Sequence, residues 1–135
     1  MSDIEVKGYI VKRDRLYTET DEWVKIEGDI AVIGITDYAQ KKLKNIIGIE
    51  LPSRGTRVRA GDTIGTIESI KAVSDIYAPV GGEVIEVNER LSNEPELINH
   101  EPYEGGWMVK IKIASKDELG KLLSPEKYAE KISRD

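Results

Sequence analysis

Apolar and polar residues alternate along much of the chain, which is the pattern of β-strands that bury one face. The clearest alternation is Glu22–Glu27, and Gly28-Asp29 joins it to a second apolar stretch at Ile30–Ile33. A two-residue connection that contains glycine is typical of a tight hairpin, because glycine readily adopts positive φ. Further strands are predicted at residues 46–51, 56–59, 63–69, 76–77, 83–87 and 107–113, so the fold is predicted to be mainly β.

Helix signals occur in two parts of the chain. Thr36 is a good N-cap for a short internal helix at residues 37–44. Near the C-terminus, Ser115–Glu118 has the sequence of a capping box and Ser124-Pro125 that of a helix start. Two C-terminal helices are therefore predicted.

The remaining segments carry weaker signals. Residues 1–16 contain a short apolar alternation between charged residues, which fits either an edge strand or a loosely held tail, and we expect order from about Tyr17 onward. Residues 90–106 are predicted to form a long ordered loop. The strand after that loop is expected to turn one face inward, formed by Trp107, Val109, Ile111 and Ile113.

The stretch around Lys71 is the most unusual local feature. So few residues separate the strand predicted at 63–69 from the β-rich segment at 76–87 that the chain must reverse between them. Lys71 would then stand at the tip of a hairpin. The sequence Ser69-Ile70-Lys71-Ala72 contains none of the Gly, Asn or Pro residues that normally form turns. A turn that opposes local preference is often retained for its function.

Composition excludes several classes of partner. The 135 residues include 20 basic and 25 acidic side chains, so nucleic-acid binding is not expected. The chain has no cysteine, which favours a reducing intracellular compartment. No segment approaches the roughly 18 apolar residues of a membrane span. The N-terminus carries acids and lacks the basic and apolar runs of a targeting segment, so a cytoplasmic protein is expected.

The chain also has few residues for catalysis. His100 is its single histidine and lies in a polar stretch without a nucleophile elbow, so we interpret it as an ordinary loop residue. Metal ligands and glycine-rich phosphate loops with the required spacing are absent from the sequence. The sequence therefore favours a protein that is not an enzyme.

Four stretches carry a family resemblance. They are Tyr17–Val24 (YTETDEWV), Ile33–Gln40 (IGITDYAQ), Glu68–Asp75 (ESIKAVSD, followed by Ala78-Pro79) and Pro102–Trp107 (PYEGGW). In this order they resemble the H proteins of the glycine cleavage system, which are lipoyl carriers, over about residues 14–130. The resemblance implies a small barrel-sandwich hybrid like that of lipoyl domains, with a short internal helix and C-terminal helices. Residues 1–135 would form a single lipoyl-carrier domain with an N-terminal extension at 1–16 and a C-terminal helical segment at 114–135.

The same resemblance implies a carrier function centred on Lys71. Lys71 would hold lipoic acid in amide linkage, so the attached group brings the chemistry and the protein supplies position and shelter. The carrier would take an aminomethyl group from a pyridoxal-phosphate glycine decarboxylase to a folate-dependent aminomethyltransferase. It would then pass reducing equivalents to a dihydrolipoamide dehydrogenase. A lipoate ligase or lipoyltransferase would attach the group.

Two sets of residues follow from the family pattern. For recognition by the modifying enzyme these are Glu68 and Gly82, with Gly55 as a weaker candidate; a solvated acid and plain turn geometry are the alternative explanations. For a cleft that shelters the cationic aminomethyl arm they are Thr20, Glu22 and Asp75, and ordinary surface acids and caps are the alternative. The chain departs from many relatives at Asp21, where they have histidine.

Other functions stay open at this point. A lipoyl domain of a 2-oxo acid dehydrogenase would be shorter and would lack the motif around Trp23 and the C-terminal helices. A biotinyl domain tends to flank its lysine with methionines, whereas the neighbours here are Ile70 and Ala72. A lipoyl relay that donates lipoate to other carriers has the same sequence features as a glycine cleavage carrier. An unmodified domain that only binds partners is the fourth alternative.

Overall fold

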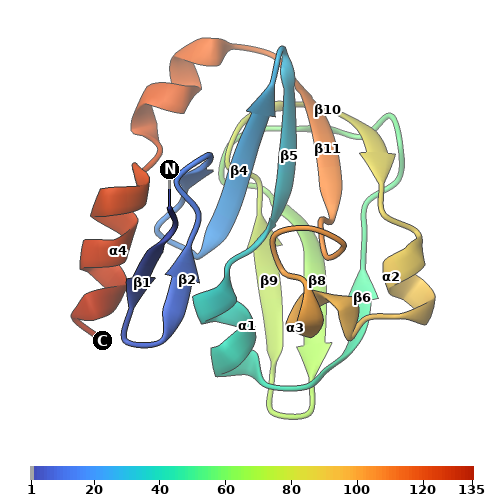
Figure 1. The fold of residues 1–135 in the computed structure, drawn as a ribbon. Helices are drawn as coiled ribbons and strands as arrows, with labels where there is room; N and C mark the ends of the chain where they lie inside the picture. Colours follow the sequence, from blue (N-terminus) through green and yellow to red (C-terminus); the bar gives the residue numbers. More distant parts are fainter. Residues whose placement is uncertain (1) are drawn as a thin grey trace.

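Two antiparallel sheets form the body of the molecule (Figure 1). The computed structural model describes residues 2–135. The larger sheet has six strands in the order β3 (Leu16–Tyr17), β4 (Glu22–Glu27), β5 (Ile30–Ile35), β11 (Val109–Ile113), β10 (Gly82–Val87) and β7 (Arg57–Val58). The smaller sheet has three strands in the order β6 (Ile46–Glu50), β8 (Thr63–Ser69) and β9 (Val73–Tyr77). The fold is thus mainly β, as predicted.

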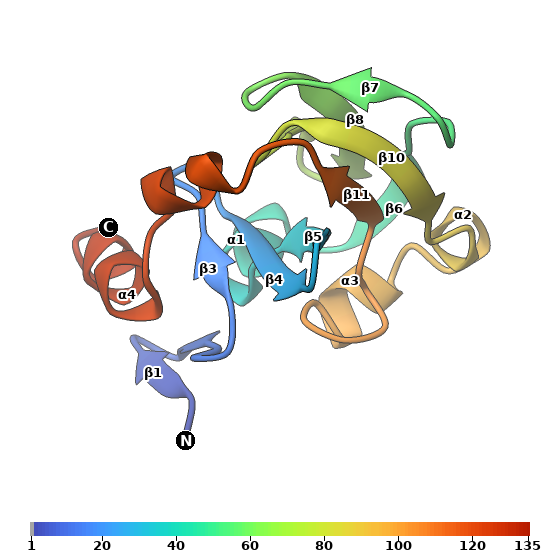
Figure 2. The same cartoon turned by 90° about the horizontal axis from the view of Figure 1, so that it is seen from above.

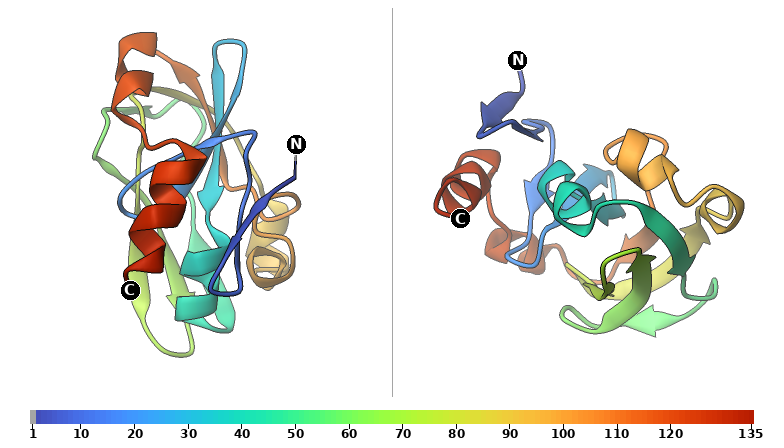
Figure 3. Two further views of the ribbon diagram at one scale, coloured as in Figure 1. Left: turned by 60° about the vertical axis from the view of Figure 1, so that its left-hand side comes forward. Right: turned by 90° about the horizontal axis from the view of Figure 1, so that it is seen from below.

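Helices lie at the edges of these sheets. They are α1 (Asp37–Leu43), α2 (Arg90–Asn93), α3 (Leu97–His100), the 3₁₀-helix η1 (Lys116–Lys121) and α4 (Pro125–Ser133). The view from above (Figure 2) and the right-hand view of Figure 3 place α4 and the N-terminal strands at one end of the molecule and α2 at the other. Within residues 2–135, no helix is long and apolar enough to cross a lipid bilayer.

The alternating pattern of β4 and β5 places their side chains in two separate apolar clusters. Val24 and Ile33 face the main core, where they pack with Ile67 of the smaller sheet and Ile111 of β11. Trp23 faces a second cluster, which also contains the aromatic residues Tyr17, Tyr38, Tyr103 and Tyr128. Because one pair of strands supplies both clusters, the two cores are mechanically connected.

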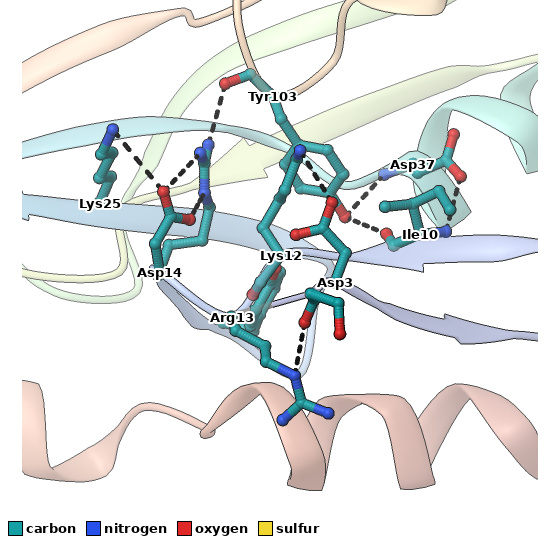
Figure 4. Close-up of polar contacts among 11 residues, drawn as sticks. Asp3, Ile10, Lys12, Arg13, Asp14, Lys25, Asp37 and Tyr103 are labelled. Carbon is teal, nitrogen blue, oxygen red and sulfur yellow. Dashed lines mark hydrogen bonds and ion pairs between the residues drawn. The ribbon is translucent and has the colours of Figure 1, made fainter.

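The N-terminal residues form a hairpin, so the alternative of a loosely held tail is wrong. Strands β1 (Ile4–Val6) and β2 (Tyr9–Val11) pair in a separate two-stranded sheet. The Tyr103 hydroxyl donates to the carbonyl of Ile10 at 2.6 Å, and the Ile10 amide donates to Asp37 Oδ2 at 2.9 Å (Figure 4). Buried Arg15 donates to the Tyr103 carbonyl at 2.9 Å and lies 4.6 Å from the centroid of the Trp23 ring. These contacts order the chain well before Tyr17.

Three other expectations differ from the structure. Residues 90–106 contain the short helices α2 and α3, where a loop was expected, and His100 is exposed at the end of α3. Trp107 precedes β11 and joins the second cluster, so only Val109, Ile111 and Ile113 face inward along that strand. The Ser115 side chain makes no capping hydrogen bond, and the segment after it is a 3₁₀-helix.

The capping residues of the two longer helices were predicted correctly. Thr36 Oγ1 accepts a hydrogen bond from the Ala39 amide at the start of α1, at 3.2 Å. Ser124 Oγ accepts one from the Lys127 amide at the start of α4, where Pro125 occupies the first position. Both bonds satisfy amides that a helix leaves without an internal partner.

Candidate functional site

The Ser69 side chain closes the turn that carries Lys71. Ser69 Oγ accepts hydrogen bonds from the amides of Lys71 at 3.1 Å and Ala72 at 3.0 Å. The Ser69 amide in turn donates to the Ala72 carbonyl at 2.8 Å. A serine hydroxyl can replace a backbone partner in this way, so the turn needs neither glycine nor proline. Strand β9 begins at Val73, whereas the strand was predicted to begin at Ile76. Only three residues therefore separate the end of β8 at Ser69 from the start of β9.

A chain of hydrogen bonds fastens this tip to the body of the protein. The Ile70 amide donates to the Asn45 carbonyl at 3.0 Å, in the connection between α1 and β6. That connection is held by the Asn99 side chain of α3, which accepts from the Ile46 amide at 2.9 Å and donates to the Lys44 carbonyl at 2.8 Å. Asn99 thus supports the tip from a distance without touching Lys71.

Lys71 itself is exposed in the turn between β8 and β9, and that turn lies at the lower end of the molecule in Figure 1. Its Nζ donates to the backbone carbonyl of Lys42 at 3.3 Å. Carbonyls at the C-terminal end of a helix attract cations, which accounts for the contact. The amine is otherwise accessible from solvent.

A cavity of about 180 Å³ lies between α1 and the β8–β9 hairpin. It brings together all three residues predicted to form a cleft, namely Thr20, Glu22 and Asp75. The wall is partly apolar, with Ile35, Ala39, Leu43 and Ile67, and Lys42 and Asp21 also line it. A larger cavity of about 630 Å³ shares Thr20 and Glu22 and continues past Tyr77 toward Leu122 and Leu123.

Glu22 is the most buried acid at the site, with 1% of its surface exposed. Its Oε1 accepts from the hydroxyls of Thr18 and Thr20, each at 2.5 Å, and its Oε2 accepts from the Tyr77 amide at 3.2 Å. Burial raises the pKa of Glu22 above its ordinary value of 4.5, and these donors act in the opposite direction. Because Tyr77 ends β9, the carboxylate also links the larger sheet to the smaller one.

Sequence reasoning did not identify Thr18 or the Tyr77 amide as partners of this carboxylate. The Thr18 hydroxyl also accepts from the Glu22 amide at 3.0 Å, which holds the loop before β4 in a closed turn. The pattern Thr18-x-Thr20-x-Glu22 places both hydroxyls near the acid, but only the fold brings β9 against it.

Asp21, the position at which the family resemblance breaks, directs its carboxylate toward α4. Its Oδ1 accepts from the Tyr128 hydroxyl at 2.9 Å and lies 3.7 Å from Lys131 Nζ. The backbone at Asp21 has φ of 72°, in the left-handed region. Burial raises the pKa of Asp21, and the contacts with Tyr128 and Lys131 lower it. Asp21 thus joins the cleft loop to the C-terminal helix.

The residues predicted for enzyme recognition lie in three different places. Glu68 is exposed on β8, next to the tip. Gly82 is buried at the start of β10, which runs along the upper part of the molecule in Figure 1, far from the tip. A Cβ at Gly82 would lie 2.0 Å from the Lys112 carbonyl oxygen, so close packing requires this glycine. Gly55 has φ of 89° in an open turn, which also requires glycine.

Comparison with known proteins agrees with this geometry. The sequence model of the family described as Glycine cleavage H-protein matches residues 15–135. A probable glycine cleavage system H protein 1 of Saccharolobus solfataricus is 57% identical over 134 residues, which cover 98% of both chains. The glycine cleavage system H protein of Carboxydothermus hydrogenoformans is 48% identical over 126 residues, covering 93% of this chain and 97% of the relative.

The structural comparison extends the match to the fold. A crystal structure of a glycine cleavage system H protein from Mycobacterium marinum has a TM-score of 0.82 and 35% sequence identity, and it covers 89% of this chain and 97% of that one. The matched residues include the motif around Trp23 and the C-terminal helices, which a dehydrogenase lipoyl domain would lack. H proteins carry their cofactor as lipoyl-lysine and act with the other components of the glycine cleavage system. The chain therefore belongs to the glycine cleavage H-protein family, and it is a lipoyl carrier of that system rather than an enzyme.

Proposed function

We propose that Lys71 is the lipoyl attachment site and that Thr20, Glu22 and Asp75 form the cleft that shelters the carried group. One observation supports this most strongly: the exposed lysine stands at the tip of the same hairpin whose flank borders the cavity with all three cleft residues. The alternative of an unmodified binding domain gives no reason for this juxtaposition.

The surroundings of Lys71 fit an amide-linked group. Acylation removes the charge of the amine, and here that change costs only one exposed hydrogen bond, from Nζ to the Lys42 carbonyl. When bound, the lipoyl group supplies a disulfide that can be reduced, loaded and reoxidised. The apolar wall of the cavity, with Ile35, Leu43 and Ile67, suits a hydrocarbon arm.

The two acids have different parts in holding a cationic cargo. Asp75 lies four residues after Lys71 on the edge strand β9 and is exposed, so its carboxylate is free to approach an amine directly. Glu22 contacts Tyr77 farther along the same strand and is already held by three donors. Its negative charge would attract the cationic cargo from a distance, and this attraction is stronger in a site that contains little water.

We further propose the family's specific partners. A pyridoxal-phosphate glycine decarboxylase, an aminomethyltransferase and a dihydrolipoamide dehydrogenase would each visit the carried group, and a lipoate ligase or lipoyltransferase would attach it. Glu68 is positioned to contact the attaching enzyme because it is exposed beside the tip. Gly82 would affect attachment only through the packing of β10 against β11, because it is buried.

Intact-mass analysis tests the attachment site. The wild-type protein from lipoate-supplied cells should carry one lipoyl adduct, and Lys71→Arg should carry none. Lys44→Arg is the matched control, because Lys44 is another exposed lysine at the end of α1. An adduct that persists in Lys71→Arg would contradict the proposal.

The cleft has its own test in the stability of the loaded carrier. Asp75→Asn removes the exposed carboxylate, so the cationic cargo should be lost to water about tenfold faster, a change that corresponds to about 1.4 kcal/mol. Release of ammonia from the purified loaded protein measures this rate. Glu50→Gln, an exposed acid on β6, should leave the rate unchanged. Equal rates for Asp75→Asn and the wild type would mean that Asp75 is an ordinary surface acid.

We also propose that residues 1–135 act as a single lipoyl-carrier domain, which thermal unfolding followed by two spectroscopic signals tests. A cytoplasmic location stays a prediction, for which cell fractionation is the direct measurement.

A further inference from the structure

Tyr128 of α4 has a buried hydroxyl group for which packing alone gives no reason. The side chain is fully buried, and its ring stacks on that of Tyr17 with 4.6 Å between the ring centroids. Phenylalanine would fill the same space and make the same stack. A buried hydroxyl loses its hydration, so it needs hydrogen-bond partners inside the protein. The partners of the Tyr128 hydroxyl are Thr36 Oγ1 at 2.7 Å and Asp21 Oδ1 at 2.9 Å.

The chemistry of these groups gives the hydrogen bonds one direction. An ionised carboxylate only accepts, so the single proton of the Tyr128 hydroxyl is donated to Asp21. Thr36 must then donate to the Tyr128 oxygen, while Thr36 Oγ1 accepts from the Ala39 amide at 3.2 Å. Burial raises the pKa of Tyr128, so the hydroxyl keeps its proton. One ordered chain of hydrogen bonds therefore runs from the start of α1 through Tyr128 to Asp21.

This chain ends at a residue whose backbone needs support. Asp21 has φ of 72°, and a residue with a side chain keeps such a conformation only where its surroundings enforce it. Asp21 lies between Thr20 and Glu22, so its backbone conformation decides how these two side chains are directed. All three residues line the cavity of about 180 Å³, whereas Tyr128 does not. The Tyr128 hydroxyl can thus affect the cavity only through the residues that it holds.

The other contacts of Asp21 are no substitute for this bond. The Thr36 amide donates to the Asp21 carbonyl at 3.0 Å, which continues the pairing of β4 with β5 but leaves the Asp21 side chain unrestrained. Lys131 Nζ lies 3.7 Å from Asp21 Oδ1, and both side chains are partly exposed, so this ion pair is weak. The Tyr128 hydroxyl is therefore the firm contact of the Asp21 side chain.

We propose that Tyr128 is a positioning residue of the cleft. Its hydroxyl holds Asp21, and through Asp21 the orientation of Thr20 and Glu22, in the arrangement that shelters the loaded arm. The inference rests on the proposed role of the cleft. Loss of the hydroxyl frees the Asp21 side chain but leaves the backbone pairing, so the loop should loosen without unfolding. Water then reaches the cationic cargo more often.

The lifetime of the loaded carrier tests this role. Tyr128→Phe removes the hydroxyl and keeps the ring. After the lipoylated variant is loaded with the decarboxylase and glycine, it should release ammonia about fivefold faster than the wild type. Tyr17→Phe is the matched control, because Tyr17 is the stacking partner and its hydroxyl donates instead to the Lys12 carbonyl at 2.8 Å. The release rate of this control should stay within about twofold of the wild-type rate.

A substitution at Asp21 shows whether the effect passes through that residue. Asp21→Gly removes the side chain and introduces a residue that readily adopts positive φ. Addition of Tyr128→Phe to Asp21→Gly should change the release rate by less than about twofold. The same acceleration by Tyr128→Phe in both backgrounds would mean that Tyr128 acts by another route, and would overturn the proposal.

Two further measurements separate positioning from general destabilisation. If the release rates of Tyr128→Phe and Tyr17→Phe simply follow their free energies of unfolding in urea, the role of Tyr128 is structural and the proposal is wrong. The KM of the decarboxylase for Tyr128→Phe as carrier should equal that for the wild type, because the buried substitution leaves the surface unchanged. A raised KM would show a wider distortion, which would also overturn the proposal.

Failure of this inference is distinguishable from failure of the cleft itself. Equal release rates for Tyr128→Phe and the wild type, together with faster release from Asp75→Asn, would overturn the role of Tyr128 alone. Equal rates for all three proteins would overturn the cleft as well.

Discussion

At the scale of single residues, the candidate site contains a carboxylate, Glu22, that is buried and fully hydrogen-bonded. Glu22 joins the loop before β4 to the end of β9 through three donors, and it lines the cavity between α1 and the β8–β9 hairpin. Hydrogen bonds fix the position of a buried carboxyl group, but its ionised form has lost the favourable hydration that it would have in water. The same residue therefore contributes to the shape of the cavity and, when it is ionised, to its negative charge.

The pKa of Glu22 gives a pH-dependent prediction. Burial raises the pKa of Glu22 in the folded state above the ordinary value of 4.5, which applies to the unfolded state. At pH values between these two pKa values, the folded state binds more protons than the unfolded state. The contribution of Glu22 to stability is therefore fully present below about pH 4.5 and is lost as the pH rises through the folded pKa. In Glu22→Gln this pH dependence is absent. Its free energy of unfolding should also be lower by about 1–3 kcal/mol at every pH, because the hydrogen bonds around position 22 are altered.

Urea unfolding between pH 4.5 and 7.5 measures the effect. The stability advantage of the wild type over Glu22→Gln should be largest at the acidic end and should decline toward neutral pH. Asp21, whose pKa is also raised, is present in both proteins and cancels in the comparison. Glu19→Gln, an exposed neighbour, should follow the wild-type profile. An advantage that does not change with pH would mean that Glu22 titrates normally.

At the scale of elements, the tip depends on a helix that sequence reasoning did not find. Residues 90–106 are rich in turn-forming residues, so a loop was expected, yet α3 places Asn99 against the connection between α1 and β6. Helices of four residues, such as α3, have too few positions to show an apolar period. The strands and the caps at Thr36 and Ser124 were predictable because their signals are local, whereas the support of the tip depends on contacts between distant segments.

In the candidate site, too, some features could be predicted from the sequence and others depend on the fold. Lys71 and the three cleft residues were named from family motifs, and the closeness of those three residues came from the fold. The bonds from Thr18 and the Tyr77 amide to Glu22 depend on how two sheets approach, which no local pattern encodes. The burial of Gly82 likewise results from the approach of β11, so its spacing from Lys71 in sequence gave no indication of its distance in space.

Loss of Asn99 should loosen the tip selectively. In Asn99→Ala the Ile46 amide and the Lys44 carbonyl lose their side-chain partner, so the hydrogen bond from Ile70 to Asn45 should open more often. Native-state hydrogen exchange should then be about tenfold faster at the Ile70 amide, with little change in the core amides of β11. Asn93→Ala, an exposed asparagine in α2, is the control. Uniformly faster exchange would indicate general destabilisation instead of a specific support.

At the scale of the whole molecule, the two apolar clusters should unfold together. Adjacent residues of β4 face opposite clusters, Val24 the main core and Trp23 the aromatic one, so neither cluster can open without disrupting this strand. The N-terminal hairpin adds to the aromatic cluster, and just after it Arg13 Nη1 lies 2.6 Å from Glu126 Oε2 of α4. Residues 1–135 should therefore behave as one cooperative unit.

Thermal unfolding checks this prediction. Tryptophan fluorescence reports mainly on the aromatic cluster, because Trp23 and Trp107 both pack there, and far-ultraviolet circular dichroism reports on the sheets. The two signals should give the same Tm. A fluorescence transition at lower temperature than the loss of sheet would show that the N-terminal hairpin and α4 form a separate unit.

The closed turn at Ser69 has a consequence for motion. Within residues 2–135, the non-glycine residues at positive φ lie elsewhere, at Lys7, Asp21 and Lys44, and the turn contains no glycine. Its backbone is held at Ser69 from within and at Asn45 from outside, so we expect the Cα of Lys71 to move little relative to the sheets. A lipoyl group attached here, as we propose, would therefore move mainly by rotation about the single bonds of its arm. Each of the proposed enzymes would then have to bring its own reaction centre within the length of that arm.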